Sequence, residues 1–292
     1  MNSKKPMTPD TPHIIILGTA QDGGYPQTGC IKDCCKRVWN DLPLRRLVTS
    51  IAIINPGSKE TWLIDATPDI KEQLHILNTI YHSDYNLSGV FLTHGHIGHY
   101  TGLTHFGREV MNTNDVPVFA MPGILKLLRS NHPWKQLLLN KNIKLIPLSG
   151  ESTIRLAEDI SISPIEVPHR GELTETVCYK IVGPNKTLLF IPDIDYWNEK
   201  TLSLINNTDI AIVDGTFFNK NEVPGRNIGE IPHPFMVDSM KLFKELPGEH
   251  KEKIFFIHLN HTNPVLLAKS IESKTVSDSG FCIAQEEQII GL

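Results

Sequence analysis

Between two apolar segments the chain reads Thr93-His94-Gly95-His96-Ile97-Gly98-His99. The preceding run, Val90–Leu92, is typical of a buried strand, so the histidines stand in a loop at a strand end. Neutral imidazole is the commonest protein ligand for zinc and ferrous ions. Histidines this dense predict a metal site, in preference to a solvated loop with incidental histidines.

This pattern resembles H-x-H-x-D-H, the first metal-binding motif of the metallo-β-lactamase-fold hydrolases. His94, His96 and His99 match its histidines, and Gly98 stands where the family has an aspartate. The resemblance implies a catalytic centre of one or two zinc ions, or iron or manganese in their place. Because Gly98 removes a carboxylate, we expect the second position to be empty, weakly bound or completed by water. On this reasoning a Gly98→Asp variant should gain metal.

The family's later ligands also follow strands. The candidates at the ends of predicted strands are His169, Asp193 and His258. By resemblance, His169 completes the first position with the first two motif histidines. His258 joins His99 at the second position, and Asp193 bridges the two. The alternatives are a surface-loop histidine at 169, a helix cap at 193 and a core histidine at 258.

Three of the five cysteines lie close together, at Cys30, Cys34 and Cys35, which favours metal or redox chemistry over a disulfide scaffold. The hydrolytic relatives carry a structural zinc held by N-terminal cysteines and by a histidine three residues beyond the last catalytic one. Here that histidine is His261. The relatives' C-x-C-x-x-C spacing differs, because Lys32 stands at the middle position. Three thiolates and an imidazole make a closed tetrahedral zinc site; the alternative is a reduced cluster without metal.

A second resemblance spans most of the chain. The segments Leu17–Cys30, Trp62–Ile70 and His258–Pro264 are similar to the PqqB proteins of pyrroloquinoline quinone biosynthesis. The complete histidine cluster, in contrast, looks more like the hydrolytic relatives, which include cyclic phosphodiesterases of phosphonate breakdown.

Further residues are assigned to proton transfer and support. In the related tRNA 3′-processing hydrolases an acidic residue and a downstream histidine act together, so we predict that Asp214 orients His233, which protonates the leaving group. The alternative is a turn aspartate and a helix-entry histidine. We expect Asp65 to support a ligand histidine. We expect Arg45 and Arg46 to bind an anionic group of the substrate, a solvated face being the alternative.

Short β-branched runs alternate with helical stretches along the chain, which predicts an α+β protein with two sheets flanked by helices. The resemblance implies a four-layer αββα sandwich of the metallo-β-lactamase type. We predict a single domain over 13–292 after a disordered tail over 1–12. The predicted helices include 68–80, 195–205 and 264–271.

Composition limits the classes of partner that we expect for the protein. The 292 residues include 28 Lys+Arg and 32 Asp+Glu, a net charge of -4, so no general basic field favours nucleic acid. The apolar runs are too short to span a membrane, and the first residues lack the apolar core of a signal peptide. We therefore expect a cytoplasmic protein with a small, anionic substrate and neither a nucleic-acid nor a membrane partner. Homodimer formation is left open.

The sequence thus predicts a metal-dependent hydrolase in which a metal-activated water attacks a phosphodiester-type or other small ester. Two alternatives stay open. One is a PqqB-like, iron-dependent oxygenase acting on a peptide- or amino-acid-derived substrate. The other is a non-catalytic metal-binding or sensor protein, motivated by Gly98.

Overall fold

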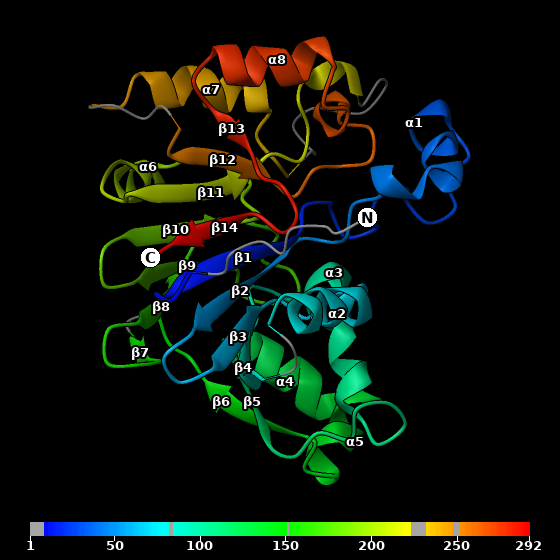
Figure 1. Cartoon of the computed structure of the whole chain (residues 1–292), viewed down its shortest axis with the longest axis vertical. Helices are drawn as coiled ribbons and strands as arrows, with labels where there is room; N and C mark the ends of the chain where they lie inside the picture. The colour runs from blue at the N-terminus through cyan, green and yellow to red at the C-terminus, as the bar shows by residue number, and fades with distance from the viewer. Residues whose placement is uncertain (1–8, 82–83, 151, 223–231, 248–251) are drawn as a thin grey trace.

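Two sheets form the centre of the molecule (Figure 1). The computed structural model describes residues 9–81, 84–150, 152–222, 232–247 and 252–292. Within these residues the first seven-stranded sheet runs, in spatial order, β14 (Ile289–Gly291), β1 (His13–Gly18), β2 (Ser50–Asn55), β3 (Glu60–Ile64), β4 (Asn86–Phe91), β5 (Val116–Ala120) and β6 (Ile143–Pro147). The second seven-stranded sheet runs β13 (Cys282–Ile283), β12 (Ile254–Ile257), β11 (Ile210–Asp214), β10 (Thr187–Ile191), β9 (Val177–Val182), β8 (Ser161–Glu166) and β7 (Ile154–Arg155).

Helices cover the outer faces of both sheets. In Figure 1 the helices α7 and α8 lie at the end of the molecule with β12 and β13, and α2 to α5 lie at the other. The first sheet is covered by α2 (Ile70–Tyr81), α3 (Ile97–Tyr100), α4 (Pro122–Ser130) and α5 (Trp134–Leu139). The second is covered by α6 (Glu199–Asn206), α7 (Met236–Lys244) and α8 (Ile271–Asp278), and the short α1 (Asp33–Lys36) projects beside the sheets.

The strand β1 shows how the sequence builds these layers. Successive side chains of a strand point to opposite faces. Ile14 and Ile16 pack in the core between the sheets, whereas Ile15 and Leu17 pack in the core beneath the helices of the first sheet. A strand with helices on one side and a sheet on the other is therefore buried at every position. The predicted αββα sandwich is confirmed.

Strand direction gathers the functional loops. Strands β3 to β6 are parallel, as are β10 to β13. Strand β8 runs in the same direction as β10, because both are antiparallel to β9. The carboxyl ends of parallel strands meet at one edge of a sheet, where loops commonly form a site. The two sheets are joined at this edge, since the Val177 amide donates to the Thr93 carbonyl at 3.1 Å and the Tyr179 hydroxyl donates to the Leu92 carbonyl at 2.7 Å.

Helix boundaries differ from the predictions where polar side chains cap the backbone. The helix predicted over 195–205 is α6, which begins later because Asn198 and Thr201 form a capping box. The helix predicted over 264–271 is wrong. That segment begins with a short 3-10 turn, and α8 follows it, capped by the Ser270 side chain. Further 3-10 turns are Val38–Asn40, Leu42–Leu44, Thr101–Phe106 and Lys220–Glu222.

Residues 1–8 of the predicted tail lie outside the described part of the chain. The Pro12 carbonyl accepts a hydrogen bond of 3.0 Å from the Leu292 amide, so backbone pairing begins inside the predicted tail. None of the helices in the described ranges has both the length and the apolarity needed to cross a membrane.

Candidate metal centre

Three predicted ligands meet after the ends of β4 and β8. His94 Nε2 lies 2.8 Å from His96 Nδ1, and His169 Nε2 lies 3.4 Å from the same Nδ1. Two nitrogens that share a tetrahedral zinc ion, with bonds of about 2.0 Å, lie about 3.3 Å apart. The spacing is therefore close to that of a single metal position, and the structure brings together the residues predicted for it.

A second group of ligand atoms stands beside the first. It contains His99 and His258, as predicted, and also Asp22, which the sequence reasoning missed. Asp22 Oδ1 lies 3.3 Å from His99 Nε2 and 4.0 Å from His258 Nε2. Burial alone would raise the pKa of Asp22, but the neighbouring histidines, His99 above all, outweigh it and lower that pKa below its usual value. Asp22 therefore presents an ionised carboxylate to this group.

Asp193 lies between the two groups. Its Oδ1 is 3.6 Å from His169 Nε2 and 3.5 Å from His258 Nε2, and its Oδ2 is 3.4 Å from His99 Nε2. One carboxylate thus faces both groups, as a bridging ligand would. Burial raises the pKa of Asp193 to about 8, so it needs a positive neighbour to remain ionised at neutral pH.

Carboxylates behind the cluster orient two of its histidines. His99 Nδ1 lies 2.7 Å from Asp65 Oδ2, and His169 Nδ1 lies 3.0 Å from Asp195 Oδ1. Because an ionised carboxylate only accepts hydrogen bonds, each Nδ1 donates its proton to the carboxylate, and each Nε2 is the nitrogen left to face a metal. Asp65 therefore lies where the sequence analysis expected it, behind a ligand histidine.

Threonine hydroxyls orient two more of the histidines. Thr93 Oγ1 lies 3.0 Å from His94 Nδ1, and Thr216 Oγ1 lies 3.0 Å from His258 Nδ1. The Thr93 hydroxyl donates its own proton to Asp65, so its oxygen accepts from His94. Burial lowers the pKa of both His94 and His258 far below the ordinary histidine value, which keeps them neutral, the form that binds metal.

Two residues of the cluster have left-handed backbone angles. Asp65 and His258 adopt left-handed backbone angles, with φ of 67° and 63°. Such angles cost a non-glycine residue about 1–3 kcal/mol and cluster at functional sites. Both side chains are directed into the cluster by this conformation.

The innermost atoms of the cluster call for a cation. Among the described residues, no hydrogen-bond partner is present for the buried atoms Asp22 Oδ1, His99 Nε2, Asp193 Oδ2 and His258 Nε2. An unpaired buried polar atom costs about 1–3 kcal/mol. A divalent ion would satisfy all four, because imidazole and carboxylate suit Zn²⁺, Fe²⁺ and Mn²⁺. The residues therefore fit a metal centre.

Asp214 and His233, the residues predicted for proton transfer, are in contact. Asp214 Oδ2 lies 2.7 Å from His233 Nδ1, and the backbone amides of Ile194 and Thr216 donate to the same carboxylate. Burial alone would lower the pKa of His233, but the Asp214 carboxylate outweighs burial and raises it. His233 is therefore held as an imidazole that keeps its proton to higher pH than usual.

A cavity of about 1030 Å³ opens onto the cluster. Its lining includes Asp22, His96, His169, Asp193, His233, Leu127, Arg170, Leu173 and Phe217, of which Arg170 and Leu173 are exposed. The predicted substrate residues Arg45 and Arg46 line a separate hollow beside α2. The structure does not bring Arg45 and Arg46 to the metal cluster. Among the described residues that line the cavity at the cluster, the arginine is Arg170.

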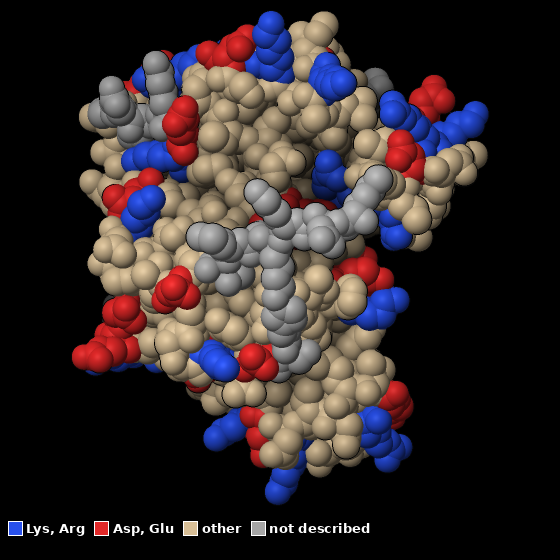
Figure 2. All heavy atoms as spheres, viewed as in Figure 1, with Lys and Arg blue, Asp and Glu red and all other residues tan. Residues whose placement is uncertain are grey.

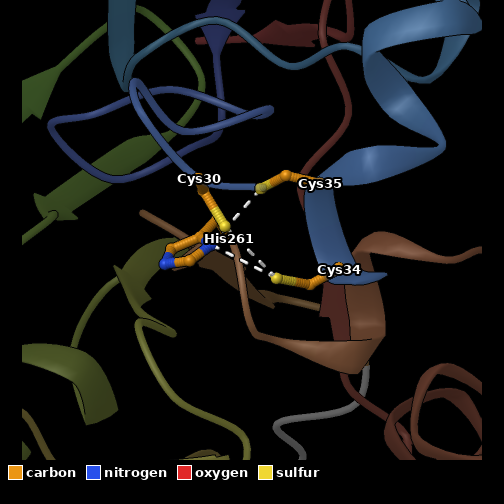
Figure 3. A group of neighbouring side chains, drawn as sticks. All are labelled: Cys30, Cys34, Cys35 and His261. Carbon is orange, nitrogen blue, oxygen red and sulfur yellow. Dashed lines mark hydrogen bonds between the residues drawn. The ribbon is translucent and has the colours of Figure 1, made fainter. Parts of the chain in front are cut away.

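The cysteine cluster lies apart from this cavity, where α1 meets the loop after β12 (Figure 3). Cys34 Sγ lies 3.8 Å from Cys30 Sγ, and His261 Nδ1 lies 3.5 Å from Cys34 Sγ and 3.3 Å from Cys35 Sγ. Around a tetrahedral zinc ion, sulfur atoms lie about 3.8 Å apart and sulfur and nitrogen about 3.5 Å. Burial raises the pKa of Cys35 to about 12, so its thiolate form needs a cation. The four residues fit a structural zinc, and Lys32 takes no part.

The sequence reasoning missed two carboxylates. Asp22 was overlooked because it stands in a glycine-rich turn without ligand spacing; the available signal was the aspartate missing at Gly98, which calls for a carboxylate from elsewhere. Asp195 stands just before a predicted helix, where an aspartate commonly caps the backbone, but Asn198 caps α6 and Asp195 contacts His169.

An αββα sandwich with histidine and aspartate side chains converging at its strand ends defines a metallo-β-lactamase-type protein. The sequence profile of the family described as Beta-lactamase superfamily domain matches residues 60–259, more than half of the chain. The chain belongs to this family.

Within this family, the chain is similar to PqqB proteins. The chain is 25% identical over 299 residues to the coenzyme PQQ synthesis protein B of Methylorubrum extorquens, covering 94% of this chain and 98% of that one. The crystal structure of Zn²⁺-bound PqqB from Methylobacterium extorquens superimposes with a TM-score of 0.82, at 25% identity, over 96% of this chain and 100% of that one. A diphosphatase of the PhnP family shares the fold, with a TM-score of 0.70 at 21% identity, over 96% and 98% of the two chains. The chain thus falls in the PqqB-like branch of the fold.

Proposed function

We propose that the protein is a metal-dependent hydrolase acting on a small phosphodiester-type or other ester substrate. One observation carries the proposal: Asp22 and Asp193, which have unpaired ligand oxygens, line the same cavity as His233, the ring that Asp214 orients. When bound, divalent ions supply two effects, a lowered pKa of a water molecule and polarisation of the scissile oxygen.

The chain's own residues supply the remaining chemistry. His233 donates a proton to the leaving oxygen, and Asp214 orients the ring and stabilises its charged form. The exposed Arg170 attracts an anionic substrate. The apolar side chains Leu173 and Phe217 contact the rest of the substrate and limit the access of water.

The size of the cavity favours a small molecule, and one face of the molecule carries charges of both signs. Ligand pockets of about 300–1,000 Å³ are typical of small substrates, and this one lies at the upper end. On the face drawn in Figure 2, positive and negative side chains of the described residues are interspersed, whereas a nucleic-acid site needs a basic stripe. The fold shared with a PhnP-family diphosphatase supports a phosphate ester by analogy.

The test combines metal analysis with a substrate panel. Protein loaded with Zn²⁺ or Mn²⁺ is assayed on phosphodiesters, diphosphates, lactones and thioesters. His94→Ala should lose metal and hydrolysis, while His75→Ala, which removes an exposed histidine of α2, should keep both. Full metal content without hydrolysis of any class would refute the proposal and favour a non-catalytic metal-binding protein.

A second candidate is an iron-dependent oxygenase acting in coenzyme PQQ synthesis or a related pathway. It is favoured by the similarity to PQQ synthesis protein B along 94% of this chain. Iron in the purified protein and consumption of O₂ with a peptide- or amino-acid-derived substrate would support this candidate against the hydrolase. Hydrolysis by zinc-loaded, iron-free protein would exclude it as the sole activity.

A further inference from the structure

The Asp22 side chain occupies the space that a side chain at position 98 would need. A Cβ atom built on Gly98 would overlap Asp22 Oδ1 and would lie 2.8 Å from both Asp22 Cα and Cγ. Real Cβ atoms do not approach other heavy atoms so closely. The glycine in the histidine motif is therefore the residue that leaves room for the Asp22 side chain.

The turn that carries Asp22 is fixed on the metal side of the fold. The Gly24 amide donates to the Gln21 carbonyl at 2.7 Å, which closes a turn with Asp22 at its second position. Gly24 has a φ of +69°, which glycine adopts without strain. The Gln21 amide donates to the Leu259 carbonyl at 2.9 Å, next in sequence to the ligand His258. The turn is thus attached to the segment whose histidine it faces.

The Asp22 carboxylate ends among unpaired ligand atoms. Its Oδ1 is buried and lies 3.3 Å from His99 Nε2 and 4.0 Å from His258 Nε2. Among the described residues none of these three atoms forms a hydrogen bond. Three donor atoms at these separations, together with an oxygen of Asp193, make a set of the kind that holds zinc.

We infer that Asp22 is the carboxylate ligand of the second metal position and that it replaces, from a different loop, the aspartate missing at Gly98. The second position is then complete, and the expectations drawn from Gly98 alone change. An aspartate introduced at 98 should not add metal, because its Cβ collides with the ligand already present. The inference rests on the metal centre of the proposed function but not on its reaction.

The test moves the carboxylate between the two positions. Asp22→Asn, Gly98→Asp and the exchange variant Asp22→Gly/Gly98→Asp are titrated with Co²⁺ in a chelator competition. The thiolate-to-cobalt absorption band reports the cysteine cluster separately. Asp238→Asn, which removes an exposed carboxylate of α7, is the matched control. Melting temperatures of the metal-free forms show whether each variant folds.

Asp22→Asn should bind the second ion at least about 100-fold more weakly. Loss of a residue that only supports a ligand lowers metal affinity by about 10–100-fold, so a loss at or above the top of that range indicates a direct ligand. Gly98→Asp should also lose the second ion and melt at a lower temperature. Second-ion affinity within about tenfold of the starting protein in the exchange variant would support the inference, and it requires the turn to shift, because the new Cβ still meets the Cα of residue 22. The control should bind as the starting protein does.

Second-ion affinity retained within about threefold in Asp22→Asn would overturn the inference, as would normal binding and melting of Gly98→Asp. If the exchange variant does not fold or does not recover affinity, Asp22→Asn decides, since the amide has the shape of the carboxylate and no Cβ is added at position 98. A protein that binds both ions through Asp22 but hydrolyses no substrate refutes only the proposed function. Hydrolysis with an Asp22-independent second ion refutes only this inference.

Discussion

Asp65→Asn tests whether the residues behind the cluster set the metal affinity. The Asp65 carboxylate accepts hydrogen bonds from the Thr93 amide at 2.8 Å, from the Thr93 hydroxyl at 3.0 and 2.9 Å, and from His99 Nδ1 at 2.7 Å. In the variant the amide oxygen stays on the Thr93 amide, and an NH₂ group replaces the oxygen that faces His99. Two donors would then oppose each other, so the ring proton of His99 moves from Nδ1 to Nε2.

That proton would then occupy the nitrogen that faces Asp22 and Asp193. Metal binding must first reverse the tautomer, and loss of such a supporting group typically lowers metal affinity by about 10–100-fold. This corresponds to about 1.4–2.7 kcal/mol of binding free energy. Chelator competition with Zn²⁺ or Co²⁺ measures the change, and the cysteine cluster serves as an internal reference.

Asp69→Asn is the matched control. Asp69 is a nearby, half-buried carboxylate, but its Oδ2 accepts from the Val48 amide at 2.8 Å instead of contacting a ligand histidine. Its variant should keep the starting metal affinity. A folded Asp65→Asn protein that binds metal within about threefold of the starting protein would refute the tautomer reasoning.

Four further predictions concern proton transfer, the structural zinc and the substrate. Because Asp214 raises the pKa of His233, Asp214→Asn should lower that pKa, so kcat should fall with rising pH earlier than before; an unmoved alkaline limb would contradict the proposed role. His233→Ala should reduce kcat roughly 100-fold or more without changing metal content. His261→Ala should release the structural zinc and lower Tm, whereas Cys282→Ser should do neither; zinc retained by the first variant would argue against the site. Arg170→Ala should raise KM about tenfold for an anionic ester but not for a neutral lactone, and equal effects on both would exclude a charge contact.

The fold was predictable because its strands carry their own signals. Runs such as Val116–Ala120 and Thr187–Ile191 contain β-branched residues, are followed by turn residues and coincide with β5 and β10. Segments with capping side chains were harder to predict. The course of the chain around 264–271 depends on the side chains of Asn263 and Ser270, which bond to nearby backbone amides instead of continuing a helix.

The ligand histidines were predictable for a related reason. His94, His96 and His99 lie within six residues, at the end of β4 and the start of α3, so their proximity follows from the sequence spacing alone. Asp193 and His258 follow strands, and parallel strands bring their carboxyl ends to one edge whatever the length of the connections. Arg45 and Arg46 had no such constraint, and the structure places them beside α2, away from the cluster.

The sequence by itself determined the class of the protein: the histidine motif, the strand-end ligands and the cysteine cluster are local patterns that can be read along the chain. Only the tertiary structure decided how the second metal position is built. The sequence shows a carboxylate missing at Gly98, but whether another fills its place depends on which loop packs against that glycine. The turn from Gln21 to Gly24 does so because it hydrogen-bonds to Leu259 and because a glycine leaves room for Asp22. Such a contact joins residues far apart in sequence, and no periodicity or spacing encodes it.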